Sequence, residues 1–159
     1  MNQASGKYIL PFFTSLKEVL EQFGVQDIDK ENLNLKDKLS SEKQVNINVG
    51  LVDDLQGNVS YGMSQKTVLE IVGMMMGGQK LEEIDEIVTS GLSEMANMAA
   101  GGATVKLSEH GLKGDISPPT IILGNDLYIV ISQVQTVTLT MKTGLGPVQI
   151  DVALEQIRN

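Results

Sequence analysis

The sequence predicts an α+β fold in which helices pack on a largely antiparallel sheet. Helical and alternating apolar periodicities occupy separate stretches of the chain, and two of the alternating runs are joined by a short polar turn. Strands and helices do not alternate as strictly as a parallel sheet would require. The expected element order is roughly α-β-β-α-α-β-β-β, in a single domain that spans residues 1–159.

The first predicted helix runs from Pro11 to Phe23, because apolar residues recur there at helical spacing and Gly24 stands at the position of a C-cap glycine. A charged connector follows at about residues 27–43. Its acidic and basic residues nearly balance, which is typical of a solvated loop with room for one short strand around Leu33 and Leu35.

A hairpin and a second helix are predicted next. Val45–Leu51 and Val59–Met63 alternate between apolar and other residues, and the Asp, Gly and Asn residues of segment 53–58 are suited to the turn between them. Ser64 is a favourable N-cap for a helix that ends at Gly77-Gly78.

The C-terminal part of the chain is predicted to form three strands after Pro118-Pro119. They cover Thr120–Leu123, Leu127–Met141 and Val148–Leu154. The second of these has 15 residues, whereas a typical strand has about 5 or 6. Such a strand can bend, carry a bulge, or offer an edge to a second copy of the chain.

Composition excludes several classes of function. The chain has 20 acidic and 12 basic residues, a net charge of -8 and no Lys/Arg cluster, so we expect no binding to nucleic acid or to an anionic membrane. With no Cys and one His, it has no thiol nucleophile and no multi-histidine metal centre. Neither a signal peptide nor a membrane-length apolar run is evident, so we expect a cytoplasmic protein.

The third predicted helix, from about Leu81 to Gly101, has the most informative pattern. One arc of the helix is expected to face the core, and it contains Ile84, Ile87, Val88, Gly91, Leu92, Met95 and Met98. The other face carries Glu94 and Asn97, which are surface neighbours because they lie three residues apart. Small residues flank this pair, namely Ser90, Ser93, Ala100 and Gly101. Any solvated helix face supplies such pairs, so the pattern alone leaves a functional and a purely structural interpretation open.

A series of short segments gives the pair a wider context. They are Val49-Gly50-Leu51, 57–64 (GNVSYGMS), 74–77 (MMMG), 92–103 (LSEMANMAAGGA), Leu107, 116–121 (ISPPTI) and Gly124. In this order and spacing they resemble the CheX chemotaxis phosphatases of the CheC-like superfamily. The resemblance implies a CheC-like fold and a functional pair at Glu94 and Asn97. The family often has Gly-Asn-Ala after the pair, whereas this chain has Gly101-Gly102-Ala103.

The implied activity is hydrolysis of the aspartyl phosphate on a CheY-like response regulator. Asn97 would orient the attacking water, and Glu94 would pair with the active-site Lys of the partner. The chain itself would bind no cofactor, because the partner supplies Mg²⁺. One Glu-x-x-Asn pair is typical of CheX, whereas CheC carries two, and the first helix of this chain has none.

The resemblance also implies a homodimer joined through sheet edges, for which the long strand Leu127–Met141 would supply an edge. The alternative function is a noncatalytic binding module of the same fold, similar to flagellar switch domains, that captures the phosphorylated regulator. A phosphate-release assay distinguishes the two. Asp53-Asp54 is better interpreted as turn residues than as a site, and His110 as a surface residue.

Overall fold

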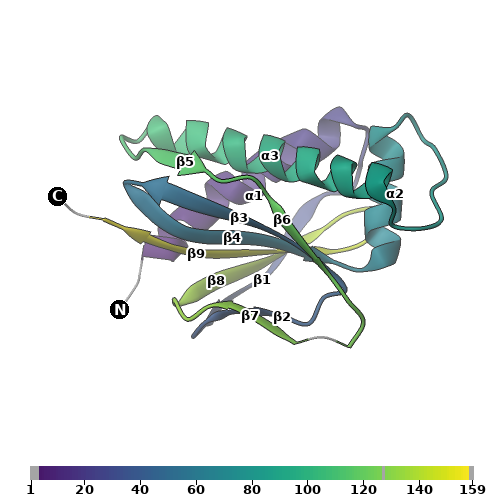
Figure 1. Cartoon of the computed structure of the whole chain (residues 1–159). Coiled ribbons are helices and arrows are strands. Elements are labelled where there is room, and N and C mark those ends of the chain that lie inside the picture. Colours follow the sequence, from purple (N-terminus) through teal and green to yellow (C-terminus); the bar gives the residue numbers. More distant parts are fainter. Residues whose placement is uncertain (1–3, 127, 158–159) are drawn as a thin grey trace.

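A seven-stranded antiparallel sheet with helices over one of its faces forms the centre of the fold (Figure 1). The computed structural model describes residues 4–126 and 128–157. The helices are α1 (Ala4–Gln22), α2 (Gln65–Met75) and α3 (Glu86–Ser108). The strands are β1 (Asp29–Lys36), β2 (Leu39–Ser41), β3 (Val45–Asp53), β4 (Leu55–Met63), β5 (Gly114–Ile116), β6 (Thr120–Leu123), β7 (Ile129–Ser132), β8 (Thr136–Lys142) and β9 (Val148–Gln156).

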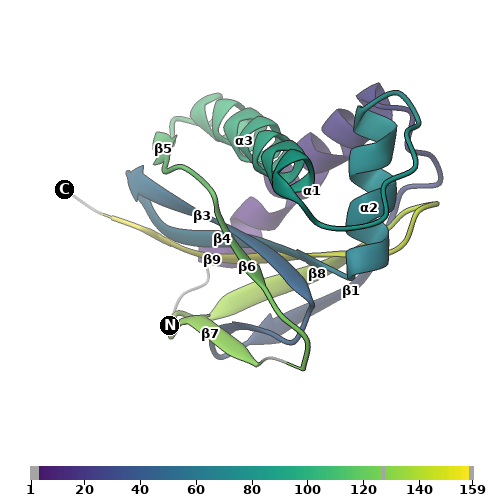
Figure 2. The ribbon, with the colours of Figure 1, turned by 45° about the vertical axis from the view of Figure 1, so that its right-hand side comes forward.

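The strand order of the main sheet is β1-β8-β9-β4-β3-β5, and β6 pairs with β3 beside β5. Every strand pair in this sheet is antiparallel. The helices α1 and α3 lie side by side on one face, α2 stands at one end of this layer, and the small β2-β7 sheet lies on the opposite side (Figures 1 and 2). The predicted α+β class is therefore confirmed.

The N-terminal part of the chain is more ordered than its sequence indicates. Helix α1 begins at Ala4, so Pro11 lies inside the helix rather than at its start. Burial of Tyr8 and Ile9 in the core explains how the helix continues through a residue that lacks an N–H donor. The short strand expected around Leu33 and Leu35 is confirmed as part of β1, which is longer than predicted because nearly all of it is exposed and needs no apolar alternation; β2, in the same charged connector, was not predicted.

A single strand over Leu127–Met141 is wrong, but the bend expected for so long a strand is confirmed, because the chain turns between β7 and β8. At the bend, Ser132 Oγ accepts a hydrogen bond from Val134 N at 3.1 Å and Thr136 Oγ1 donates to Val134 O at 2.9 Å. Strand β7 then pairs with β2, whereas β8 lies between β1 and β9. Leu127 lies outside the described residues. Because β8 is internal, the sheet edge expected there belongs instead to β1.

The hairpin and the second helix are confirmed, with a tighter turn than predicted. Leu51 already pairs with Gly57, inside the segment expected to be the turn. The N-cap role of Ser64 is borne out, since its Oγ accepts a hydrogen bond from Thr67 N at 3.2 Å. The short strand β5 was not predicted, since three residues carry no periodic signal.

Helix α3 is shifted and rotated relative to the prediction. It begins after the N-cap Asp85, whose Oδ1 accepts a hydrogen bond from Val88 N at 3.0 Å, and it ends at Ser108 rather than at Gly101. Its buried residues are Val88, Leu92, Met95, Ala96, Ala99, Ala100, Ala103 and Leu107. Ile87, which was expected in the core, is 57% exposed.

Small residues explain this rotation, because they let α3 approach its neighbours closely. A Cβ at Gly102 would collide with Ser15 Oγ of α1, and the same hydroxyl donates a 2.6 Å hydrogen bond to Ala99 O. On the other side, a Cβ at Gly91 would lie 2.8 Å from Val72 Cγ1 of α2. The alanines of α3, together with Gly91 and Gly102, therefore belong to its packing face.

The face of the sheet opposite the helices carries polar residues in register. Asn48, Ser60, Asp151 and Thr138 follow one another across β3, β4, β9 and β8. Asp151 is 2% exposed, accepts hydrogen bonds from Gln149 Nε2, and lies 3.5 Å from Lys36 Nζ. Among residues 4–126 and 128–157, no helix has both the length and the apolar character required to span a bilayer.

The buried carboxyl of Asp151 generates a prediction about pH and stability. Burial raises the pKa of Asp151 above its ordinary value of 3.8, and its hydrogen bonds and Lys36 offset this only in part. The folded chain then holds this proton more tightly than the unfolded chain. This carboxyl's contribution to the free energy of unfolding therefore falls as pH rises through the window above 3.8.

Asp151→Asn should remove this contribution, so the stability difference between the wild type and the variant should shift against the wild type as pH rises. Urea unfolding of both proteins at pH values below and above 3.8, the ordinary pKa of Asp, measures this stability difference. Asp37→Asn, on an exposed carboxylate, is the control for the loss of one negative charge. A stability difference that does not vary with pH would contradict the prediction.

Candidate functional site

Glu94 and Asn97 lie on the outward face of α3, because both are exposed whereas the buried residues of the helix lie on its other side. Both side chains are exposed, while Met95 and Ala96 between them are fully buried. Residues three apart on a helix are neighbours, so a carboxylate and a carboxamide stand side by side in solvent. The predicted juxtaposition of the two residues is confirmed, whereas their chemical roles remain a prediction.

Neither side chain contributes to the fold by a polar contact. Within the part of the chain that the structure describes, Glu94 and Asn97 form no side-chain hydrogen bond and no ion pair. Asn is a below-average helix former, so helix propensity does not account for Asn97 either. The pair is thus free to contact a partner without breaking an existing interaction.

The surroundings of the pair differ in part from the prediction. Ser90 is exposed and Ser93 is half-buried, as expected for small residues beside the pair. Ala100 is fully buried against the core and does not belong to this surface. Gly101 does belong to it, because a Cβ added there would have no heavy atom within 4 Å. Gly102 faces α1, so the departure from the family pattern lies on the packing face.

The pair can hold a water molecule or a cationic group without placing a strong positive charge nearby. A carboxamide both donates and accepts hydrogen bonds, and a carboxylate accepts only. The basic residue of α3 is Lys106, whose Nζ lies 3.1 Å from Glu18 Oε1, more than two turns from Asn97. The arrangement suits the positioning of a nucleophile better than the binding of a free anion.

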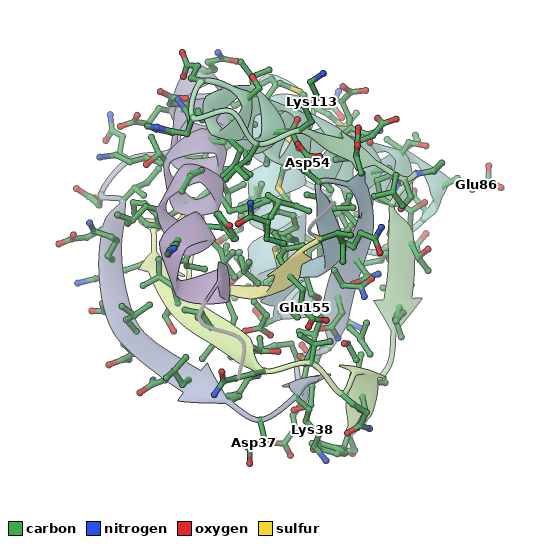
Figure 3. All side chains as sticks on the ribbon, turned by 90° about the vertical axis from the view of Figure 1, so that its left-hand side faces the viewer. Asp37, Lys38, Asp54, Glu86, Lys113 and Glu155 are labelled. Carbon is green, nitrogen blue, oxygen red and sulfur yellow. The ribbon has the colours of Figure 1, made fainter. Side chains whose placement is uncertain are left out.

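The other candidate residues have structural roles or are isolated. Asp54 Oδ2 accepts a hydrogen bond from Lys113 N at 3.0 Å, and the two residues lie close together in Figure 3. Asp53 has a φ of 94° in the hairpin turn, consistent with its interpretation as a turn residue. His110 is exposed in the turn after α3. In residues 4–126 and 128–157, no three His, Asp or Glu side chains are grouped closely enough to hold a metal ion.

Comparison with known proteins places this geometry in a family. Residues 45–142, more than half of the 159-residue chain, match the family described as chemotaxis phosphatase CheX. The chain is 38% identical over 81 residues to the CheY-P phosphatase CheX of Thermotoga maritima. This alignment covers 51% of the chain and 52% of that protein, so it spans about half the length of the curated relative.

Solved structures of similar fold cover nearly the whole chain. A CheC-like superfamily protein from Shewanella sp. PV-4 is 30% identical, with a TM-score of 0.83 over 98% of this chain and 99% of that one. A CheX–CheY–BeF₃–Mg²⁺ complex from Borrelia burgdorferi contains a chain of the same fold. It is 24% identical, with a TM-score of 0.79 over 94% of this chain and 98% of that one. On the family match, the chain belongs to the chemotaxis phosphatase CheX family.

Proposed function

We propose that this chain is a phosphatase that hydrolyses the aspartyl phosphate of a CheY-like response regulator. The observation that carries the proposal is the exposed, unpartnered pair Glu94 and Asn97 on the outward face of α3. Two further facts support it: the chain is a member of the CheX family, and the solved complex from Borrelia burgdorferi pairs CheX with CheY. A surface pair of this kind is suited to chemistry completed at an interface.

The partner brings most of the catalytic groups. Phosphoryl transfer depends mainly on positioning and on neutralising the phosphoryl oxygens, and a response regulator supplies Mg²⁺ and a Lys for the second task. The carbonyl oxygen of Asn97 accepts a hydrogen bond from a water and holds it in line with the phosphorus. The water oxygen bonds to phosphorus as the bond to the aspartyl oxygen breaks. The products are inorganic phosphate and the free carboxylate, and the excess proton passes to solvent.

A neutral amide is well suited to this position. A second carboxylate at Asn97 would repel the phosphoryl oxygens, and a basic residue would bind them rather than a water. Glu94 has the complementary task, because its carboxylate pairs with the active-site Lys of the partner and aligns the two surfaces. The chain therefore needs no cofactor of its own in this scheme.

Asn97→Ala should abolish the acceleration of phosphate loss, because Ala cannot hold the water. Loss of one positioning group of this kind lowers a rate by about 10²- to 10³-fold. The measurement is release of phosphate from a phosphorylated CheY-like regulator, with and without the chain. Stability should change by less than about 0.7 kcal/mol, because Asn97 is exposed.

Gln22→Ala removes an exposed carboxamide from α1 and is the matched control, with full activity expected. Glu94→Ala should mainly weaken association, and Glu94→Lys should weaken it further through repulsion of the partner's Lys. Full activity of Asn97→Ala would rule out the proposed role. Binding of the regulator without faster phosphate loss by the wild type would favour the noncatalytic binding module.

We also propose that the chain forms a homodimer through the β1 edge of the sheet. Strand β1 is the terminal strand beside β8, and Leu33 and Leu35 on it are 61% and 67% exposed. Beside it lies a hollow of about 340 Å³ lined in part by Ile9, Leu10 and Leu33. An unpaired edge with exposed apolar side chains is suited to pairing with a second copy.

Light scattering at micromolar concentration should give twice the mass of the chain. The double substitution Leu33→Lys and Leu35→Lys should give the monomer mass, since charges on an edge strand oppose pairing. Val52→Lys, at a similarly exposed residue of β3, is the control and should leave the dimer intact. A wild-type monomer under these conditions would contradict the dimer.

A further inference from the structure

The outward face of α3 carries two large apolar side chains that no described residue covers. Ile87 is 57% exposed near the start of the helix, and Val105 is 63% exposed near its end. They are 18 residues apart, which is five full turns, so the two side chains project in the same direction. Both are β-branched and have below-average helix propensity, so neither packing nor propensity accounts for them.

Glu94 and Asn97 lie midway between these two residues. The midpoint of 87 and 105 is position 96, and the helix rises by about 1.5 Å per residue, so the stripe from Ile87 to Val105 is about 27 Å long. Glu94 is within about 20° of the line that joins the two apolar residues, and Asn97 is at one margin of the stripe. Charge and amide chemistry at the centre are thus flanked by an apolar contact at each end.

Gly101 adds an independent observation one turn after Asn97. Of the three glycines in α3, Gly91 and Gly102 are explained by close contacts with Val72 and Ser15. Gly101 is not, because a Cβ there meets open space and its backbone is helical. Gly in the interior of a helix destabilises it by comparison with Ala. The fold itself therefore gives no reason for glycine at this position.

We propose that the outward face of α3 from Ile87 to Val105 is one continuous docking surface for the response regulator. Ile87 and Val105 make the apolar contacts at its two ends, and Gly101 provides the clearance that lets the partner's backbone approach Asn97. This inference rests on the proposed function and extends it to three residues outside the Glu94–Asn97 pair. All three are positioning residues, because none touches the reacting atoms.

The length of the surface fits this occupant. A receiver domain of just over 100 residues has a radius of gyration of about 13 Å, which corresponds to a sphere about 34 Å across and is enough to span the stripe of about 27 Å. One such domain centred on Glu94 and Asn97 would cover both Ile87 and Val105. An apolar rim at both ends would also exclude water from the polar centre, where dehydration strengthens electrostatic interactions.

The experiment measures binding and turnover separately. The probe is a CheY-type response regulator held active with beryllofluoride and Mg²⁺ for Kd, and the phosphorylated regulator for kcat and KM. Ile87→Ser and Val105→Ser should each raise Kd by about five- to tenfold and leave kcat near the wild-type value. Val52→Ser is the matched control, because Val52 is 57% exposed on β3 and alternates with the core residue Leu51.

Gly101 has a test that separates docking from folding. Gly101→Ala should shift the midpoint of urea unfolding upward, because the fold has space for the methyl group, and should at the same time raise Kd. Gly101→Leu should raise Kd further. A merely structural glycine would lose stability and binding together.

Three outcomes are distinguishable. Weaker binding with near-wild-type kcat for the Ile87 and Val105 variants, together with a Gly101→Ala variant that is more stable but binds more weakly, supports the docking surface. Unchanged Kd values in the Ile87, Val105 and Gly101 variants, with an active wild type, would overturn this inference and leave the proposed phosphatase intact. A wild type that neither binds nor dephosphorylates the regulator would overturn both.

Discussion

The rotation of α3 about its own axis is the constraint on which the proposed functional surface depends. Alanine and glycine residues of α3 pack closely on α1, and the hydroxyl of Ser15 spans this contact with a 2.6 Å hydrogen bond to Ala99 O. A larger side chain at Gly102 would collide with that hydroxyl. Because one face of the helix is fixed in this way, the opposite face, with Glu94 and Asn97, must point outward. The proposed chemistry is thus positioned by residues that take no part in it.

An exposed pair without internal partners is an incomplete site, and this is consistent with a division of labour between two proteins. The chain has 20 carboxylates and little positive charge available for a phosphate, so it is poorly equipped to bind a phosphoryl group alone. A partner that carries the phosphoryl group together with Mg²⁺ and Lys removes that need. What remains is to place one water and to align two surfaces, for which a carboxamide and a carboxylate on a rigid helix are sufficient.

Much of this could be predicted from the sequence where local signals are strong. Ser64 and Gly77 marked the ends of α2, and the segment around Glu94 and Asn97 marked both the pair and the family. The failures arose where tertiary contacts override the pattern. Ile87 was assigned to the core because it is apolar, and the size of its side chain was not considered. Small alanines instead occupy the packing face, because they let α3 approach α1 most closely. Ala96 and the run of Ala and Gly over positions 99–103 were the available signal. The full length of β1 could not be predicted beyond the short strand around Leu33 and Leu35, because an exposed edge strand needs no apolar face. The three residues of β2 are too few for a periodic signal.

The structure of the chain bound to a beryllofluoride-activated regulator is the decisive test of the roles proposed for Glu94 and Asn97. We expect α3 to lie over the regulator's active site, with the carboxamide of Asn97 about 2.7–3.2 Å from a water in line with the phosphoryl mimic and Glu94 beside the partner's Lys. A complex in which the regulator contacts another face of the chain, or in which Asn97 lies away from the mimic, would contradict it.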